Sequence, residues 1–283
     1  MCHYHGMSRP GPRGTMIIAA PAGVARGDVP HLPVAPGELL TAALACEQVG
    51  ASVVRVDVRG PDGLLSLDPG LAAEDVAALR EGSSLAVLLS LEGPEDAPDA
   101  DRLRVLDALP DSASFALGAP GSDGADRWEF AVAAHEATRE RGIVPEYGIS
   151  GAGQLALLRR LLDERGLPAG GLVHVGLVLG APGGLPGDAD TLVSLVRELP
   201  EGALFSATGL DRAGLPVLLA ALASGGHLRV GLADTPEYAE GQRAQSTTQL
   251  VARAAGVARI AQRPPLSGAQ ARELLGRRAP VRV

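Results

Sequence analysis

Three ionisable side chains, Arg55, Asp57 and Arg59, occupy every second position of the otherwise apolar segment ASVVRVDVRG. Alternate side chains of an extended strand share one face, so these three groups are expected to point the same way. A guanidinium binds a carboxylate through paired hydrogen bonds and stabilises negative charge where water is excluded. The segment predicts either a site that holds a small anion or a structural ion-pair network, since buried charges persist mostly when paired.

Further polar side chains stand at the ends of other apolar runs. Arg229 and Asp234 fall near the last of these runs, and a carboxylate beside a guanidinium is ionised, so Asp234 can serve as a base or an anchor. The same pairing lowers basicity, so a base role requires substrate binding to redirect the arginine. The other candidates at strand ends are Ser90, Glu92, Glu146, Tyr147, Thr208, Asp211 and His227.

The histidines and cysteines are weaker candidates. His174 lies inside LVHVGLV, where a lone histidine is more often a hydrogen-bonded core residue than a ligand. Cys2, His3 and His5 lie together, but a terminal cluster without a fixed fourth ligand does not make a zinc site. The sequence contains no lysine, which excludes Schiff-base chemistry and the usual covalent attachment of pyridoxal phosphate.

The elements that must position these groups alternate regularly along the chain. Amphipathic stretches with helical spacing, such as RWEFAVAAHEATRERG, separate eight short apolar runs. This alternation predicts an α/β fold, a closed (β/α)₈ TIM barrel, whose functional groups lie at the C-terminal ends of the strands. An open doubly wound sheet is the alternative, disfavoured because no G-x-G-x-x-G follows the first strand. The predicted strands are MIIAAP, ASVVRVDV, SLAVLLS, SASFALG, GIVPEYGI, LVHVGLVLG, GALFSATG and GGHLRVGL.

The predicted domain organisation is simple. Residues 1–15 lack apolar periodicity and are expected to form a flexible arm, and residues 16–283 are expected to form one barrel domain. The last barrel helix is predicted over residues 247–260. SGAQARELLG, residues 267–276, is predicted to be an appended C-terminal helix.

Composition limits the partners and the compartment. The chain has 283 residues, is 46% hydrophobic and carries a formal net charge of −8, which argues against binding to nucleic-acid phosphates. Its two cysteines cannot form a disulfide framework, and it has neither a membrane-length apolar run nor a signal-peptide core. We therefore expect a cytoplasmic protein that binds neither nucleic acid nor membrane.

Several segments resemble, in order and spacing, the β-keto acid cleavage enzyme family. The likeness runs from about Met16 to Gly276, and its most specific parts are GASVVRVDVR and GGHLRVGLAD. The resemblance implies a TIM barrel that binds a divalent metal, usually zinc, and assembles as a homo-oligomer. It also implies acyl transfer between a β-keto acid and acetyl-CoA as co-substrate, giving acetoacetate and a new CoA thioester.

The resemblance assigns roles to particular residues. Arg229 and Asp234 match the family's arginine and its catalytic acidic residue, and Glu146 matches a glutamate of the fifth strand, so these three are predicted to be catalytic. The Gly-rich loops GAPGGLPG and TGLDRAG match loops at the substrate and CoA end, where backbone N–H groups can hold carboxylate or phosphate. The predicted substrate-binding residues are Arg55, Asp57, Arg59, Ser90 and Thr208.

The sequence departs from the family at the metal ligands. The typical second strand reads H-x-H-x-R and the last reads R-V-G-L-E-D, whereas this chain has Arg55, Asp57 and Ala233 at the three ligand positions. A guanidinium has no free lone pair, and one carboxylate does not make a zinc site, so no metal or firm cofactor is predicted. Arg55 would then supply a fixed positive charge in place of the metal.

Three functions remain open at this point. The first is an altered, metal-independent acyltransferase that acts on a β-keto acid or a related small carboxylate with a CoA thioester. The second is a non-catalytic or regulatory homologue that binds a small carboxylate or CoA ester, or partners an active paralogue. The third and weakest keeps the barrel but changes the chemistry to that of an aldolase or lyase.

Overall fold

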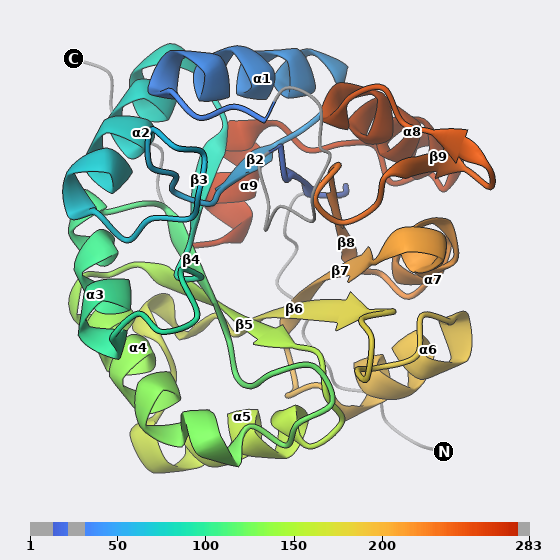
Figure 1. Ribbon diagram of the computed structural model, residues 1–283. Helices are drawn as coiled ribbons and strands as arrows, with labels where there is room; N and C mark the ends of the chain where they lie inside the picture. Colours follow the sequence, from blue (N-terminus) through green and yellow to red (C-terminus); the bar gives the residue numbers. More distant parts are fainter. Residues whose placement is uncertain (1–13, 22–31, 277–283) are drawn as a thin grey trace, which may run out of the picture.

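The computed structural model describes residues 14–21 and 32–276 and confirms the closed barrel. Eight parallel strands pair in chain order, and β8 closes the ring by pairing with β1 (Figure 1). The strands are β1 (Ile17–Ala19), β2 (Val53–Val56), β3 (Ala86–Ser90), β4 (Ser112–Ala116), β5 (Val144–Ile149), β6 (His174–Leu179), β7 (Leu204–Gly209) and β8 (His227–Val230).

Helices surround the ring of strands. Each predicted helix is present, and the structure adds two elements that the sequence patterns did not reveal, a short helix α3 and an antiparallel hairpin, β9 with β10. Both are too short to show a period. The helices are α1 (Pro36–Val49), α2 (Pro69–Gly82), α3 (Asp99–Arg104), α4 (Trp128–Glu140), α5 (Gln154–Arg165), α6 (Ala189–Glu198), α7 (Gly214–Ala223), α8 (Thr247–Ile260) and α9 (Gly268–Leu274); the hairpin strands are β9 (Glu237–Ala239) and β10 (Gln242–Arg243).

Local chemistry determines where the helices begin and end. The Asp68 side chain accepts hydrogen bonds from the backbone N–H groups of Gly70 and Leu71 and caps α2. α1 ends at Gly50, whose φ of +121° is a conformation that side chains with a Cβ rarely adopt. A Cβ at Gly50 would also lie 3.1 Å from that of Ala255 in α8, so the glycine allows α1 and α8 to pack closely.

The apolar core has two parts. The larger part lies between the strands and the outer helices, and the smaller part fills the barrel interior at the N-terminal ends of the strands. In the smaller part, Ile18 and Val53 from the strands and Met16, which precedes β1, meet Leu266 and Leu275 from the C-terminal segment. The C-terminal segment thus closes this end of the barrel, and in Figure 1 α9 lies inside the ring of outer helices.

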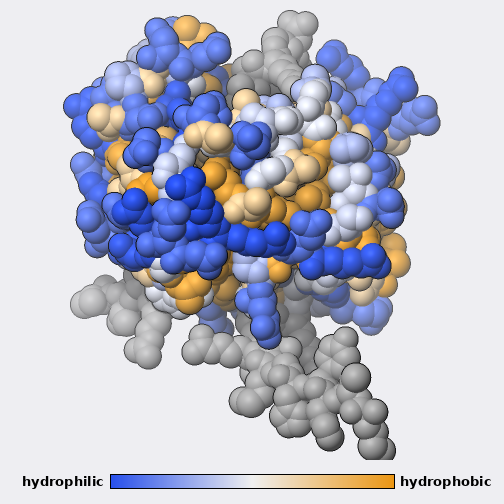
Figure 2. Space-filling view, turned by 90° about the horizontal axis from the view of Figure 1, so that it is seen from below, coloured by the Kyte–Doolittle hydropathy of each residue, from blue (hydrophilic) through white to orange (hydrophobic). Residues whose placement is uncertain are grey.

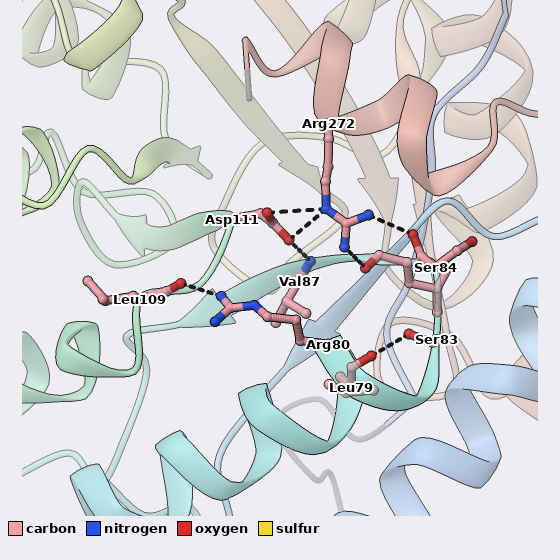
Figure 3. A network of polar contacts seen from close by, with 9 residues as sticks. Leu79, Arg80, Ser83, Ser84, Val87, Leu109, Asp111 and Arg272 are labelled. Carbon is pink, nitrogen blue, oxygen red and sulfur yellow. Dashed lines mark hydrogen bonds and ion pairs between the residues drawn. The ribbon is translucent and has the colours of Figure 1, made fainter. Parts of the chain in front are cut away.

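A buried ion pair fastens α9 to the barrel (Figure 3). Arg272 of α9 contacts Asp111 at 3.3 Å and donates to the carbonyl oxygens of Ser84 and Leu85, which precede β3. Asp111 also accepts a hydrogen bond of 2.9 Å from the backbone N–H of Val87. Together these contacts tie α9 to the chain that enters β3 and β4.

One face of the molecule is mostly polar. Figure 2, viewed from below relative to Figure 1, shows hydrophilic side chains over much of this side, with apolar side chains between them. Across the described ranges, no helix is long and apolar enough to cross a bilayer.

The predicted arm lies outside the described residues except for its last two, and Cys2, His3 and His5 lie outside them as well. Thr15 is buried, and its backbone N–H donates a 2.9 Å hydrogen bond to the carbonyl oxygen of Pro264. The described part of the chain ends at Gly276, the last residue of the predicted appended helix.

Replacing Asp111 with alanine is expected to destabilise the barrel. The change leaves the buried Arg272 guanidinium without a counter-charge and the Val87 N–H without an acceptor, so the free energy of unfolding should fall by about 3 kcal/mol. Denaturant unfolding followed by circular dichroism measures the loss. Asp107→Ala is the control, because Asp107 is 62% exposed in its pair with Arg141 and its loss should cost less than about 1 kcal/mol. Equal losses of stability in Asp111→Ala and Asp107→Ala would contradict the role assigned to the Arg272–Asp111 pair.

Candidate functional site

Arg55, the third residue of β2, points into the barrel. Val53 packs in the inner apolar layer, whereas Val54 and Val56 pack against the outer helices. Because side chains alternate along a strand, Arg55 shares the inward face with Val53. It lies on the C-terminal side of the apolar layer and is only 7% exposed. The guanidinium is therefore inside the barrel, where the sequence pattern placed it.

Arg55, Asp57 and Ser90 form one hydrogen-bonded group. Arg55 donates from Nη2 to Asp57 Oδ1 at 2.9 Å and to Ser90 Oγ at 2.8 Å. The Ser90 oxygen also accepts a 3.2 Å hydrogen bond from the backbone N–H of Glu92. These contacts join Ser90, at the end of β3, to Arg55 in β2 and, through Arg55, to Asp57 just after β2.

The prediction that Asp57 and Arg59 lie on the same strand as Arg55 is wrong. β2 ends at Val56, because β1 pairs with it only as far as Val54 and β3 only as far as Val56. Arg59 forms an isolated antiparallel bridge with Leu65 and donates to the carbonyl oxygen of Gly63. Asp57 remains in the site, and Arg59 lies close enough for the Asp57 charge to raise the pKa of its guanidinium, although burial lowers that pKa by more.

Arg229 and Asp234 form a second pair at the end of β8. Arg229 Nη2 donates to Asp234 Oδ1 at 2.9 Å, and only 11% and 7% of their side chains are exposed. A turn that joins the backbone N–H of Asp234 to the carbonyl oxygen of Gly231 brings the carboxylate back towards the strand. Arg229 and Asp234 both line a small cavity of about 10 Å³, and Thr208 of β7 lines it as well.

Glu146 of β5 belongs to a third group. Ser206 of β7 donates to Glu146 Oε1 at 2.8 Å, and His174 of β6 lies 3.2 Å from the serine oxygen. His174 is thus a hydrogen-bonded core residue, as predicted. His227 is also structural, because its Nδ1 accepts a 2.9 Å hydrogen bond from the backbone N–H of Met16.

Electrostatic interactions join the three groups into one charged site. Burial raises the pKa of the Asp57 carboxyl, but the Arg55 guanidinium, the Ser90 hydroxyl and the Arg229 guanidinium together lower it by more, so the net direction is down. Burial alone likewise lowers the pKa of Arg55, and Asp57, Asp234 and Glu146 together raise it above its ordinary value. Arg55 and Asp57 are therefore both ionised at neutral pH.

Glu146 is ionised for similar reasons. Burial raises the pKa of its carboxyl, whereas the Arg229 and Arg55 guanidiniums and the Ser206 hydroxyl lower it, and the net direction is down. Burial lowers the pKa of His174 despite the neighbouring Glu146, so the imidazole is neutral at neutral pH.

Several buried polar atoms of this site have no hydrogen-bond partner among the described residues. Each of the two arginine–aspartate pairs is joined through a single Nη2–Oδ1 contact, which leaves further hydrogen-bonding capacity. Buried groups of this kind are rare in folded proteins unless water or a ligand satisfies them. The unpartnered atoms are Arg55 Nε, Asp57 Oδ2, Arg229 Nε and Asp234 Oδ2.

A larger cavity of about 290 Å³ adjoins the Arg229–Asp234 pair. It lies between the start of α7 and the β9–β10 hairpin, and it shares Gly214, Thr235 and Arg253 with the small cavity. Within the described segments, no three histidine, cysteine, aspartate or glutamate side chains are grouped to hold a metal ion.

Sequence comparison now decides the family. The family model of the β-keto acid cleavage enzymes matches residues 15–276. The chain belongs to this family. The 3-keto-5-aminohexanoate cleavage enzyme of Acetoanaerobium sticklandii is 26% identical over 268 residues, 92% of this chain and 97% of that enzyme. The 3-oxoadipate:acetyl-CoA acetyltransferase of Cupriavidus necator is 25% identical over 258 residues, 88% and 89% of the two chains.

Solved structures support the barrel fold of this β-keto acid cleavage family member. The apo structure of ObcA matches with a TM-score of 0.70 at 16% identity and covers 87% of this chain. The match covers 66% of the ObcA chain, so this chain spans about two thirds of its length.

Sequence reasoning did not single out Ser206 as a partner of Glu146. Its only signal was its position two residues before Thr208, which places both hydroxyls on the inward face of β7. Which carboxylate Ser206 meets depends on how β5, β6 and β7 are aligned, and a single sequence does not reveal that alignment.

The depressed pKa values of Asp57 and Glu146 make stability depend on acidity. In the unfolded chain Asp57 and Glu146 titrate at their ordinary pKa values of 3.8 and 4.5, whereas in the folded protein their pKa values are lower. Below the ordinary values the unfolded chain therefore binds more protons than the folded protein, and stability falls as the pH drops. Urea unfolding at a series of pH values measures this decline. Asp57→Asn should lower stability at neutral pH and make the acid decline shallower. An unchanged decline would contradict the ionised, paired state of Asp57.

Asp75 of α2 provides a control of opposite sign. Burial, helped by Glu74, raises the pKa of its carboxyl to about 6, so ionising Asp75 costs stability as the pH rises through this value. Asp75→Asn should therefore be more stable than the wild type at pH values above about 6, whereas Asp57→Asn is less stable.

Proposed function

We propose that this protein transfers an acyl group from a β-keto acid to CoA, with acetyl-CoA as co-substrate, and that it does so without a metal. The observation that carries this proposal is the buried Arg55 guanidinium, which is bonded to Asp57 and Ser90 and has an unpartnered Nε. Two relatives have names that describe cleavage of a keto acid and transfer from acetyl-CoA, which supports the reaction class.

The chemistry requires a base and fixed positive charge. A base removes a proton from the carbon between the keto and carboxylate groups, and the carbanion attacks the thioester carbon of acetyl-CoA and expels the CoA thiolate. The thiolate then attacks the original keto carbon. Cleavage of the adjacent carbon–carbon bond releases the new thioester and the acetoacetate enolate, which takes the proton back. Each step develops negative charge on an oxygen, so preorganised cations lower the barrier.

The described side chains can divide these tasks. Asp234 acts as the base once the substrate carboxylate draws Arg229 away from it, and its unpartnered Oδ2 is available for the proton. Arg55 and Arg229 hold the substrate carboxylate and the enolate oxygen. Glu146 acts as their counter-charge. Ser90 and Thr208 contribute hydroxyl groups beside them, and Arg59 adds a buried positive charge near Asp57.

Zinc does not fit the residues at the ligand positions of this family. Arg55 has no lone pair to donate, and Asp57 Oδ1 already accepts a hydrogen bond from Arg55. Ala233 offers no donor atom. One remaining carboxylate oxygen is not a zinc site, so the fixed guanidinium is proposed to perform the charge stabilisation.

The second candidate is a non-catalytic homologue that binds a small carboxylate or CoA ester. The small size of the cavity beside Arg229 and Asp234, about 10 Å³, favours it, because a substrate must displace side chains to reach the pair. A thermal shift with carboxylates or CoA esters, without turnover of any β-keto acid, would support this candidate.

The first prediction here concerns metal. Protein purified without chelator should contain zinc far below one equivalent by elemental analysis. The variant that carries R55H, D57H and A233E restores the family's ligand types and is expected to take up zinc. Stoichiometric zinc in the wild type would overturn the metal-independent proposal.

A second prediction concerns turnover. With an active β-keto acid identified from a panel, acetoacetate formation should fall about 100-fold or more in Asp234→Asn, and by a similar factor in Arg55→Met. Arg141→Met is the control, because Arg141 pairs with the exposed Asp107 on the outer surface. Full activity in Asp234→Asn would exclude Asp234 as the base.

A further inference from the structure

The Glu146 side chain reaches across a strand to its hydrogen-bond partner. Glu146 lies on β5 and Ser206 on β7, with β6 between them. In β6 the residue paired with Ser206 is Gly176, and a Cβ there would lie 3.0 Å from Glu146 Cδ and 3.2 Å from Cγ. Glycine therefore provides the space in which the carboxylate lies, and a larger residue would displace it.

The directions of the hydrogen bonds among His174, Ser206 and Glu146 follow from the number of protons that each side chain can donate. Ser206 has one hydroxyl proton and donates it to Glu146 Oε1. The 3.2 Å contact between His174 Nε2 and Ser206 Oγ then requires the imidazole to donate. The neutral His174 ring carries its proton on Nε2, and its Nδ1 has no partner. The result is a one-way chain of donors from His174 through Ser206 to Glu146.

This arrangement cannot relay a proton away from Glu146. His174 Nε2 already bears a proton, and the serine proton points at the carboxylate. A chain of donors that ends on a carboxylate oxygen favours its charged form. It also determines which way the carboxylate faces, because Oε1 is held on the β7 side.

We propose that Ser206, His174 and Gly176 are positioning residues that hold the ionised Glu146 carboxylate in place as the counter-charge of Arg55 and Arg229. The inference rests on the proposed function in that those two guanidiniums bind the substrate. None of the three positioning residues has to touch the substrate. Their effect reaches it through Glu146 alone.

The test is a direct titration of Glu146. Protein labelled with ¹³C at the glutamate carboxyl is followed by NMR as the pH is lowered, and Glu146→Gln identifies the signal. Ser206→Ala should raise the pKa of Glu146 by about one unit, since it removes a hydrogen bond to the charged form. His174→Leu should raise it by a smaller amount. His174→Gln, which keeps a donor near the position of Nε2, should restore the wild-type value.

Ser112→Ala is the matched control. Ser112 is a buried serine on β4 whose hydroxyl donates to the carbonyl oxygen of Val144 rather than to a carboxylate. Its loss should leave the titration of Glu146 unchanged, whereas a general effect of removing a buried hydroxyl would shift it. Gly176→Ala removes no hydrogen-bonding group and should raise the pKa of Glu146 by displacing its carboxylate.

The outcomes separate this inference from the proposed function. An unshifted Glu146 titration in folded Ser206→Ala overturns the inference, even if the wild type is an active acyltransferase. A shift with no turnover by the wild type supports the inference and removes the proposed function. If Ser206→Ala does not fold, the comparison of His174→Leu with His174→Gln gives the answer, and equal titrations in these two variants overturn the inference.

Discussion

The interior of this barrel contains buried charges that have to be balanced by one another. Arg55, Asp57, Glu146, Arg229 and Asp234 are almost completely buried, and an isolated charge at such depth would be strongly destabilising. The closed ring of strands meets this constraint because it brings β2, β5 and β8 around one space. Opposite charges that are far apart in the chain thus come within electrostatic reach of one another.

The interior is divided along the strands into an apolar part and a charged part. The C-terminal segment covers the apolar part through Leu266 and Leu275, and the Arg272–Asp111 pair keeps it there. Because the described residues fill that end, the polar groups lie towards the C-terminal ends of the strands. The filled base and the balance of buried charges are therefore both consequences of one closed ring.

The sequence was sufficient for the fold and for much of the site, because alternation is a local property. Eight apolar runs separated by helical patterns identify the barrel, and the spacing of Arg55 and Asp57 identifies their shared face. The link between Glu146 and Ser206 needed the structure, since it depends on how β5 and β7 align across β6. The end of β2 also escaped prediction, because it depends on where the neighbouring strands stop, and Arg59 was placed on a strand that had already ended.

The two ends of the described chain meet at the base of the barrel. Thr15 forms a bridge with Pro265, and its hydroxyl donates to the carbonyl oxygen of Arg263. During synthesis from the N-terminus, Thr15 emerges before all eight strands of the barrel, whereas its partners Arg263 and Pro265 follow β8 and α8. The growing chain therefore holds most of its strands before the base can close. Closure of the base thus depends on contacts between residues 248 positions apart, and a chain that lacked residues 263–275 would leave the inner apolar layer open to water, because Leu266 and Leu275 cover it.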